Sequence, residues 1–261
     1  VQTVPVDDVN PDFEGKLVHM SGTVECEEIL EDTTFGVSEK AIALKRSVEM
    51  YQWDEDSTTK TKKKVGGGTK KTKTYSYEKE WSSKLKDSSE FAKPEGHTNP
   101  SSMPYEQLKI YADVVMLGAF NLSSAQISAI TNWQDLRLGS DFQLPDSMGD
   151  NVRLHDGGLY IGADPAAPAI GDIRIKFKAA YPTDVSLIAQ QAGQTFQAFQ
   201  TDAGGKLLET KTGIHTADAM IQQAQESNKI MTWILRLVGF IVMVIGFGLV
   251  FRVASVLADV I

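Results

Sequence analysis

The stretch LVGFIVMVIGFGLVF, Leu237–Phe251, contains fifteen consecutive residues without a polar side chain. Arg236 precedes it and Arg252 follows it, sixteen positions apart, which is ~24 Å along a helix at ~1.5 Å per residue. A membrane-spanning helix needs ~20 mostly apolar residues, and residues 231–257 supply that length if the two arginines extend toward the headgroups. A soluble core helix is rarely apolar on every side for so many turns. We therefore interpret residues 231–257 as a transmembrane helix and the preceding chain as an extramembrane domain.

The same helix is expected to begin well before the apolar run. Thr216 is a good N-cap, and Asp218 lies in the first turn, where the helix dipole favours a carboxylate. No glycine or proline follows until Gly239, so residues 216–230 are predicted to form a juxtamembrane helix continuous with the span. An aromatic belt and flanking cations mark membrane interfaces. The residues expected there are Trp233, Arg236 and Arg252.

Glycines within the span suggest a helix-packing surface. Gly239 and Gly246 are seven positions apart and share nearly one helix face, and Gly248 widens that smooth strip. Small residues allow close helix approach in lipid. Two interpretations remain open: the strip packs on other spans of the same protein, or on a neighbouring subunit.

The extramembrane part reads as β-rich. In Thr74–Trp81, aromatic residues alternate with polar ones, which predicts a half-buried strand. Val48–Trp53 has a similar pattern, and the two segments are predicted to pair antiparallel. Further strands are expected at Arg153–Ile161, Asp172–Ala179, Val185–Gln191 and Thr195–Gln200, with a short helix after Ser123. The core is expected to be formed by Tyr75, Tyr77, Trp81, Ile173, Ile175 and Phe177.

These patterns predict an α+β fold: a β-rich extramembrane domain with short helices, followed by a long C-terminal juxtamembrane and transmembrane helix. Residues 1–14 form an extended N-terminal segment, residues 15–215 the β-rich domain, residues 216–230 the juxtamembrane helix and residues 231–257 the span.

The segment Asp54–Lys73 connects the two aromatic strands and carries seven lysines around three glycines. It is predicted to be a flexible, solvated hairpin tip, most mobile over about Thr58–Lys71. The alternative is a basic finger that touches anionic lipid headgroups or an acidic partner. The residues of that finger are Lys60, Lys62, Lys63, Lys64, Lys70, Lys71 and Lys73.

The sequence carries no recognisable catalytic or cofactor motif. The net charge of −8 argues against general nucleic-acid binding, and the single cysteine, Cys26, excludes an intrachain disulfide framework. There is no G-x-S-x-G, H-E-x-x-H, paired C-x-x-C, Walker loop or G-x-G-x-x-G. The histidines lie in four different segments: His19, His97, His155 and His215. We expect no catalytic residue, metal site or cofactor, and a protein that is not an enzyme.

Five stretches resemble the transmembrane protein 43 family, also called LUMA. They are Val48–Trp53 (VEMYQW), Thr74–Trp81 (TYSYEKEW), Gly96–Met103 (GHTNPSSM), Gly171–Phe177 (GDIRIKF) and Ser227–Phe240 (SNKIMTWILRLVGF). The resemblance implies one span before Val1, further spans after Ile261, and a large lumenal or periplasmic domain up to about Ser227. The Lys/Gly-rich tip and the Gln-rich stretch Gln190–Gln200 differ from animal members, which suggests a bacterial member. No catalytic residue is established for the family, so none is carried over.

Three functions remain open from the sequence. The first is a non-enzymatic multi-span scaffold whose extramembrane domain self-associates and organises a membrane patch, as in envelope maintenance. The second is a subunit of a channel or transporter, and the third a periplasmic or lumenal hydrolase. The expected partners are the lipid bilayer, further copies of the chain and other membrane proteins. The expected location is a bacterial inner membrane with a periplasmic domain, or the endoplasmic reticulum and inner nuclear membrane with a lumenal one.

Overall fold

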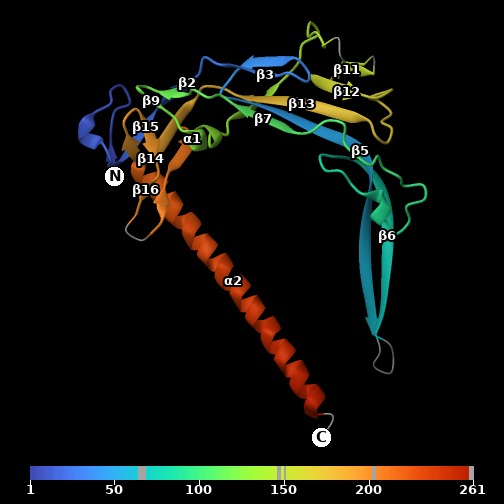
Figure 1. The fold of residues 1–261 in the computed structure, drawn as a ribbon. Helices are drawn as coiled ribbons and strands as arrows, with labels where there is room; N and C mark the ends of the chain where they lie inside the picture. Colours follow the sequence, from blue (N-terminus) through green and yellow to red (C-terminus); the bar gives the residue numbers. More distant parts are fainter. Residues whose placement is uncertain (64–68, 146–147, 150, 202–203, 259–261) are drawn as a thin grey trace.

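The protein consists of an elongated β-rich body from which two long elements project on the same side (Figure 1). One projection is the C-terminal helix α2 (Ala217–Ala258), and the other is the far part of a hairpin formed by β5 (Ala43–Lys63) and β6 (Thr69–Ser82). The computed structural model describes residues 1–63, 69–145, 148–149, 151–201 and 204–258, with backbone only at residues 63 and 250–258. The α+β fold class predicted from the sequence is confirmed.

One sheet lies at the end of the body beside α2. Its strand order is β15-β14-β2-β8-β9, with β1 and β18 paired to β2 and β14. The amide N–H of Asn121 donates to Gln194 O (2.8 Å), and Phe120 stacks on Phe196 with 5.1 Å between ring centroids, so β9 curls back onto the β14–β15 hairpin. The strands are β1 (Gln2–Thr3), β2 (Leu17–Glu25), β8 (Met116–Leu117), β9 (Phe120–Asn121), β14 (Asp184–Ala192), β15 (Thr195–Gln197) and β18 (Glu209–Thr212).

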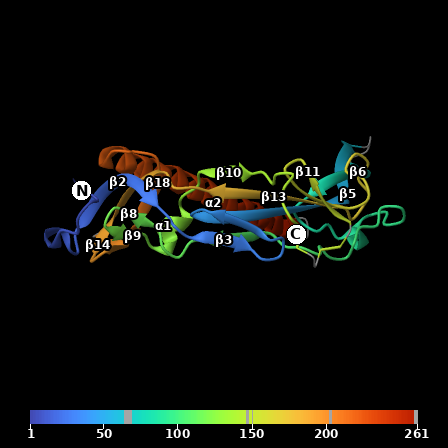
Figure 2. The ribbon, with the colours of Figure 1, turned by 90° about the horizontal axis from the view of Figure 1, so that it is seen from above.

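The second sheet forms the length of the body, seen from above in Figure 2. Its order is β11-β12-β13-β5-β6, with β10 paired to β13 and β7 to β5. Alternating apolar residues of β13 explain its central place, because Ile173, Ile175 and Phe177 are all buried. The remaining strands are β7 (Leu108–Tyr111), β10 (Trp133–Leu136), β11 (Val152–His155), β12 (Gly158–Ile161) and β13 (Ile173–Ala180).

Smaller elements complete the body. β3 (Ile29–Asp32) pairs with β4 (Val37–Lys40), and β16 (Phe199–Gln200) pairs with β17 (Lys206–Leu207). The short helix α1 (Ser124–Ser128) begins with a capping box between Ser123 and Gln126, near the position predicted from the sequence. Two 3₁₀ turns cover Pro11–Phe13 and Ser88–Glu90.

The predicted pairing of the two aromatic segments is confirmed, with Tyr51 opposite Trp81 and Trp53 opposite Lys79 in an antiparallel ladder. The predicted core is correct only in part. Tyr75, Tyr77 and Trp81 are half-buried and belong to neither hydrophobic core. The reason is that β6 pairs with the part of β5 that leaves the body, so there is little protein for these rings to pack against.

Two further expectations are corrected. The predicted single strand Arg153–Ile161 is a tight hairpin, because Asp156 and Gly157 both have positive φ (49° and 68°) and form the turn. The expected flexible tip over about Thr58–Lys71 is instead paired strand wherever it is described, since the ladder runs to Lys63 opposite Thr69. Threonines alternate with lysines there, and β-branched residues favour strands. The rest of the expected tip, residues 64–68, lies outside the described residues.

Candidate functional site

The candidate site is the part of the β5–β6 hairpin that leaves the body, together with helix α2, which projects from the other end of the body toward the same side (Figure 1). We call residues 53–63 and 69–79 the arm. On β5 the side chains from Asp56 to Lys62 are exposed, and on β6 those from Thr69 to Thr74 are exposed. Among the described pairings of β6, β5 is the only partner strand. The arm is therefore a two-stranded ribbon that stands away from the core.

Asn99 fixes the arm where it leaves the body. Its Oδ1 accepts a hydrogen bond from the Trp53 amide at 2.7 Å, and its Nδ2 donates to Trp53 O at 2.9 Å. Nδ2 also donates to Lys86 O (3.2 Å), and the Asn99 amide donates to Ser88 Oγ (2.9 Å). The Asn99 side chain thus satisfies the outer edge of β5 as a neighbouring strand would, and it ties the loop that follows β6 to the arm.

An aromatic contact holds the same loop. His97 stacks on Tyr77 at 3.8 Å and meets the edge of Trp53 at 4.7 Å between ring centroids. The Tyr77 hydroxyl donates to Glu55 Oε2 (2.7 Å), and the same oxygen accepts from the Ala92 amide (2.6 Å). Desolvation and this bond to the Glu55 carboxylate raise the pKa of Tyr77. His97 therefore holds this loop against the arm through its ring contacts.

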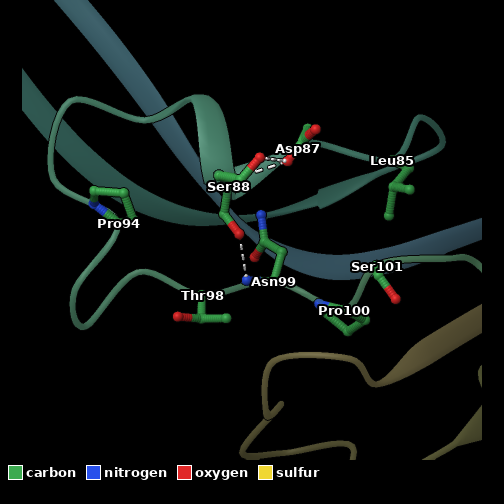
Figure 3. A pocket seen from close by; sticks show the side chains of 9 residues that line it. Leu85, Asp87, Ser88, Pro94, Thr98, Asn99, Pro100 and Ser101 are labelled. Atoms are coloured by element: carbon green, nitrogen blue, oxygen red, sulfur yellow. Dashed lines mark hydrogen bonds between the residues drawn. The ribbon is translucent and has the colours of Figure 1, made fainter.

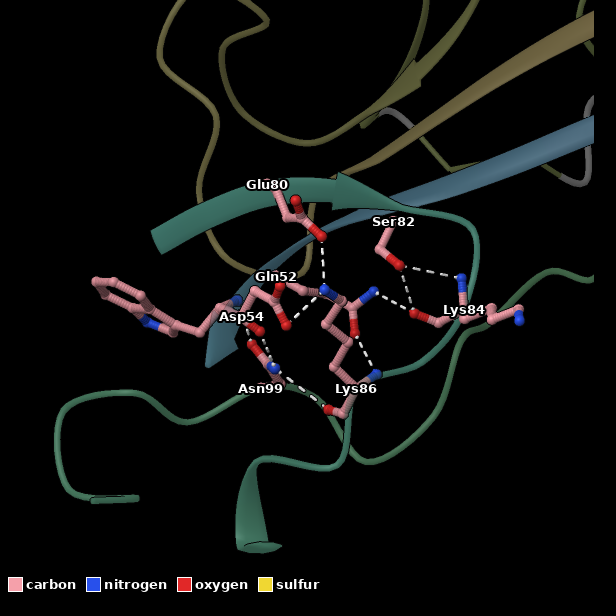
Figure 4. Close-up of polar contacts among 8 residues, drawn as sticks. Gln52, Asp54, Glu80, Ser82, Lys84, Lys86 and Asn99 are labelled. Carbon is pink, nitrogen blue, oxygen red and sulfur yellow. Dashed lines mark hydrogen bonds and ion pairs between the residues drawn. The ribbon is translucent and has the colours of Figure 1, made fainter. Parts of the chain in front are cut away.

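A charged cluster around Lys86 also holds the root of the arm (Figure 4). We call Asn99, His97 and Lys86 together the clamp. The Lys86 ammonium lies 2.6 Å from Asp54 on β5 and 2.5 Å from Glu80 on β6. Burial alone would lower the pKa of Lys86, but the two carboxylates outweigh it and raise the pKa. Gln52, which is fully buried, accepts from the Lys86 amide (2.9 Å) and donates to Lys84 O (3.1 Å). The direction of the arm is thus set by polar contacts.

A cavity of about 470 Å³ is lined by residues within 85–101 of the loop that follows β6 (Figure 3). Its polar groups are engaged in local structure: Asp87 accepts from the Ser89 amide and hydroxyl, and these bonds lower the pKa of Asp87. Ser88 Oγ is bonded to the Asn99 amide. These contacts tie the polar groups of Asp87, Ser88 and Ser89 to the loop itself.

The fold brings His19 and His215 into contact, but within the described ranges no three His, Cys, Asp or Glu residues lie close enough to hold a metal. His19 takes part in a contact that sequence reasoning missed. Its ring bonds to Thr3 Oγ1 (3.0 Å) and to His215 O (2.9 Å), and the His215 amide donates to Ser186 Oγ (2.8 Å). This buried network anchors the residues just before α2 to the first sheet. Only the tertiary fold brings these segments together.

Helix α2 contains one segment long and apolar enough to cross a membrane, Ala217–Leu249, among the residues described. Two of the predicted interface residues lie close together, with the Arg236 guanidinium 5.4 Å from the Trp233 ring centroid. A Cβ added at Gly239, Gly246 or Gly248 would meet no atom within 4 Å, so the described part of the chain leaves the strip uncovered. The side chain of Arg252 lies outside the described residues.

The arm brings the predicted lysines together. Five of them are exposed on its far half, at Lys60, Lys62, Lys70, Lys71 and Lys73. The Lys73 ammonium lies 4.8 Å from the Tyr75 ring centroid. The Lys63 side chain and all of Lys64 lie outside the described residues.

A β-rich domain joined to a long apolar helix defines the class: a membrane protein with a large extramembrane domain. Comparison with known proteins gives the family. The family profile described as Transmembrane protein 43 matches residues 50–261, and the chain belongs to that family. It is 35% identical to Transmembrane protein 43 of Rattus norvegicus and 34% identical to that of Homo sapiens, each over 96% of this chain and 64% of the relative. The Drosophila melanogaster homolog is 31% identical over 90% of this chain and 62% of the relative.

The chain therefore spans just under two thirds of the length of these curated relatives. The family resemblance inferred from five short stretches is confirmed. The family and the apolar helix together identify the chain as an integral membrane protein. No solved structure matches the chain.

Proposed function

We propose that this chain is part of a non-enzymatic, multi-span membrane scaffold, whose extramembrane domain self-associates to organise a membrane patch or a protein complex. The observation that supports this proposal is the open edge of the arm. An isolated two-stranded ribbon is marginally stable in water, and unpaired strand edges are templates for pairing with another chain. The arm has such edges on both strands.

The edge of β5 can be followed residue by residue. At Tyr51 the outer edge is paired, because the Tyr51 amide donates to Asp172 O (2.8 Å) and Tyr51 O accepts from the Gly171 amide (2.9 Å). At Trp53 it is satisfied by Asn99. Alternation places the outward groups of the far half at Ser57, Thr59 and Thr61. The hydrogen bonds found among the described residues include no partner for their backbone groups. A strand from a second copy would complete them.

The finer features of the proposal follow from the family and the arrangement. Residues 15–215 form the domain outside the membrane, on the periplasmic or lumenal side, residues 216–230 support it and residues 231–257 cross the bilayer. The proposal also includes further spans and other membrane partners. The family's proteins carry transmembrane names without an enzymatic description, which is consistent with a scaffold.

The first experiment measures the mass of the purified chain in detergent and in nanodiscs by light scattering at micromolar concentration. The scaffold proposal expects a homo-oligomer in both. A strictly monomeric mass in both would contradict self-association.

A second experiment tests whether the arm edge carries the contact. Thr59→Pro with Thr61→Pro removes two outward N–H donors without removing bonds between β5 and β6. The matched control, Thr59→Ala with Thr61→Ala, keeps those donors. We expect the proline pair to lower the oligomer mass and the alanine pair to preserve it. Equal masses for all three proteins would show that the contact lies elsewhere.

A further inference from the structure

We propose that the far half of the arm binds the phosphate groups of anionic lipids in the same membrane that α2 enters. The binding surface consists of the exposed lysines of β5 and β6. This inference goes beyond the proposed self-association, because it concerns the faces of the ribbon and not its edges.

The charge of this segment is unlike that of the chain. No Asp or Glu occurs between Asp56 and Glu78, whereas seven lysines do, in a protein with a net charge of −8. The five lysines whose side chains are described are exposed, and the ion pairs found among the described residues include none of them. Their positive charge is thus left for something outside the chain.

The pairing register concentrates this charge. Lys62 lies directly opposite Lys70, and Lys60 opposite Thr72. Directly opposed like charges destabilise a strand pair, so this register needs an anion to balance it. Alternation puts Lys60, Lys62 and Lys70 on one face, with direct neighbours ~5 Å and diagonal neighbours ~7–8 Å apart. That spacing allows several ammonium groups to contact one layer of phosphates.

The second face repeats the pattern less densely. Lys71 and Lys73 lie opposite Thr61 and Thr59, which places both lysines on the face that also carries Tyr75. Every cation of the far half is a lysine. A lysine ammonium acts as a compact point charge, whereas arginine provides a planar, bidentate fork. Lysines therefore suit a fluid layer of headgroups better than one rigid ligand.

The arm and α2 project from the same side of the body (Figure 1), which favours lipid over a distant acidic protein. The thirteen residues from Ala217 to Lys229 precede the apolar run, and they rise ~20 Å at ~1.5 Å per residue. The strand from Trp53 to Lys63 covers ~33 Å at ~3.3 Å per residue. An inclined arm is therefore long enough to reach the headgroup layer, and its polar side chains would stop it there.

The test uses the whole chain in vesicles. Thr61→Cys in a Cys26→Ser background is labelled with a fluorophore, and its quenching by nitroxide-headgroup lipid is measured. One vesicle population is phosphatidylcholine alone, and the other also contains roughly 30% phosphatidylglycerol. We expect strong quenching only in the second population, reversed at about 0.5 M salt because exposed charges are then screened.

Matched variants identify the lysines responsible. Lys60→Gln with Lys62→Gln and Lys70→Gln should abolish the dependence on phosphatidylglycerol, since each lysine near such a surface strengthens binding about fivefold. The control removes three exposed lysines elsewhere, by Lys84→Gln with Lys109→Gln and Lys206→Gln, and should keep that dependence. Loss of the dependence in both variants, or in neither, would overturn the assignment.

Oligomer mass is measured in the same samples, so the two proposals can fail separately. Quenching that is independent of phosphatidylglycerol overturns lipid binding. The label could instead become shielded in proportion to the oligomer mass, whatever the lipid composition. That result would show that the lysines contact an acidic surface of a second copy, and it would also overturn the lipid proposal. A monomer with lipid-dependent quenching would contradict the scaffold and leave the lipid site standing.

Discussion

The two ends of the body solve the problem of strand edges in different ways. Beside α2, β9 returns to the β14–β15 hairpin, and the first sheet curls around an apolar core that includes Val18, Met20 and Leu187. At the other end, β5 and β6 leave the body as a ribbon whose side chains are mostly exposed. The first end hides its edges, which is how stable β folds avoid association. The second leaves them available.

The contacts at the two ends differ in kind as well. The closed end is held by buried apolar side chains, each contributing ~1.5–3 kcal/mol. The arm is held at its root by Asn99, His97 and Lys86, through polar and ring contacts. Polar contacts contribute less net stability but impose direction. The polar contacts at the open end therefore fix the direction of the arm, whereas the apolar packing at the closed end stabilises the fold.

The largest expected effect is in the core of the body. Ile175 is fully buried on β13, opposite Val48. Ile175→Asp buries an unpaired charge and removes apolar packing. Together these costs are large compared with the usual free energy of unfolding of ~5–15 kcal/mol. We expect loss of folded protein, measured by expression and thermal melting in detergent. The matched arm variant Tyr75→Asp should melt as the unchanged chain does, and a normal melting temperature for Ile175→Asp would refute the assigned core.

A smaller effect is expected at the root of the arm. Asn99→Ala leaves the Trp53 amide and carbonyl without their partner, and an unsatisfied buried backbone group costs ~1–3 kcal/mol. We expect a lower melting temperature and a wider distribution of distances between spin labels on the arm and body. Thr98→Ala, in the same loop and exposed, is the control. An unchanged distance distribution for Asn99→Ala would show that the rings alone direct the arm.

Sequence reasoning succeeded where one local pattern controls the outcome. The apolar run after Arg236 indicated the span, and alternation in Ile173–Phe177 indicated a buried strand. The aromatic alternation in Thr74–Trp81 gave the right pairing but the wrong environment, because alternation reports two faces and not how much protein covers one of them. The prediction of one strand over Arg153–Ile161 is wrong at Asp156–Gly157, a turn dipeptide that the sequence itself shows.

The clamp of the arm could not be predicted in the same way. Asn99 lies in a polar loop, and its role depends on Trp53, which is 46 positions away. The contact between His19 and the residue before the N-cap of α2 spans 196 positions. Such polar contacts carry no periodic signature, so they become visible only when the fold brings the segments together. The lysines are evident as a group in the sequence, but only the pairing of β5 with β6 shows that Lys62 and Lys70 lie opposite each other.

Lys86 offers a weaker way to loosen the arm. Because its pKa is raised in the folded state above the ordinary 10.5, its stabilising contribution is fully present below about pH 10.5 and is lost as pH rises through the folded value. The lysine side chain is 21% exposed, so we expect Lys86→Gln to cost about 1 kcal/mol at neutral pH. Lys84→Gln is the neighbouring control. Chemical unfolding should give Lys86→Gln a lower free energy of unfolding than the unchanged chain at pH 7 and the same value above pH 11. Lys84→Gln should match the unchanged chain at both pH values.

The smallest effect on assembly is expected in the membrane. Gly239 and Gly246 share a helix face that nothing in the described chain covers, and close helix packing in lipid depends on such small residues. If the arm and the extramembrane domain carry self-association, Gly239→Leu with Gly246→Leu disturbs packing between spans while the oligomer mass stays unchanged. The control is Val242→Leu with Leu249→Ile, which changes span side chains without filling the strip. Light scattering in nanodiscs separates the outcomes, since collapse of the glycine variant to monomers would move the main interface from the open end of the body into the bilayer.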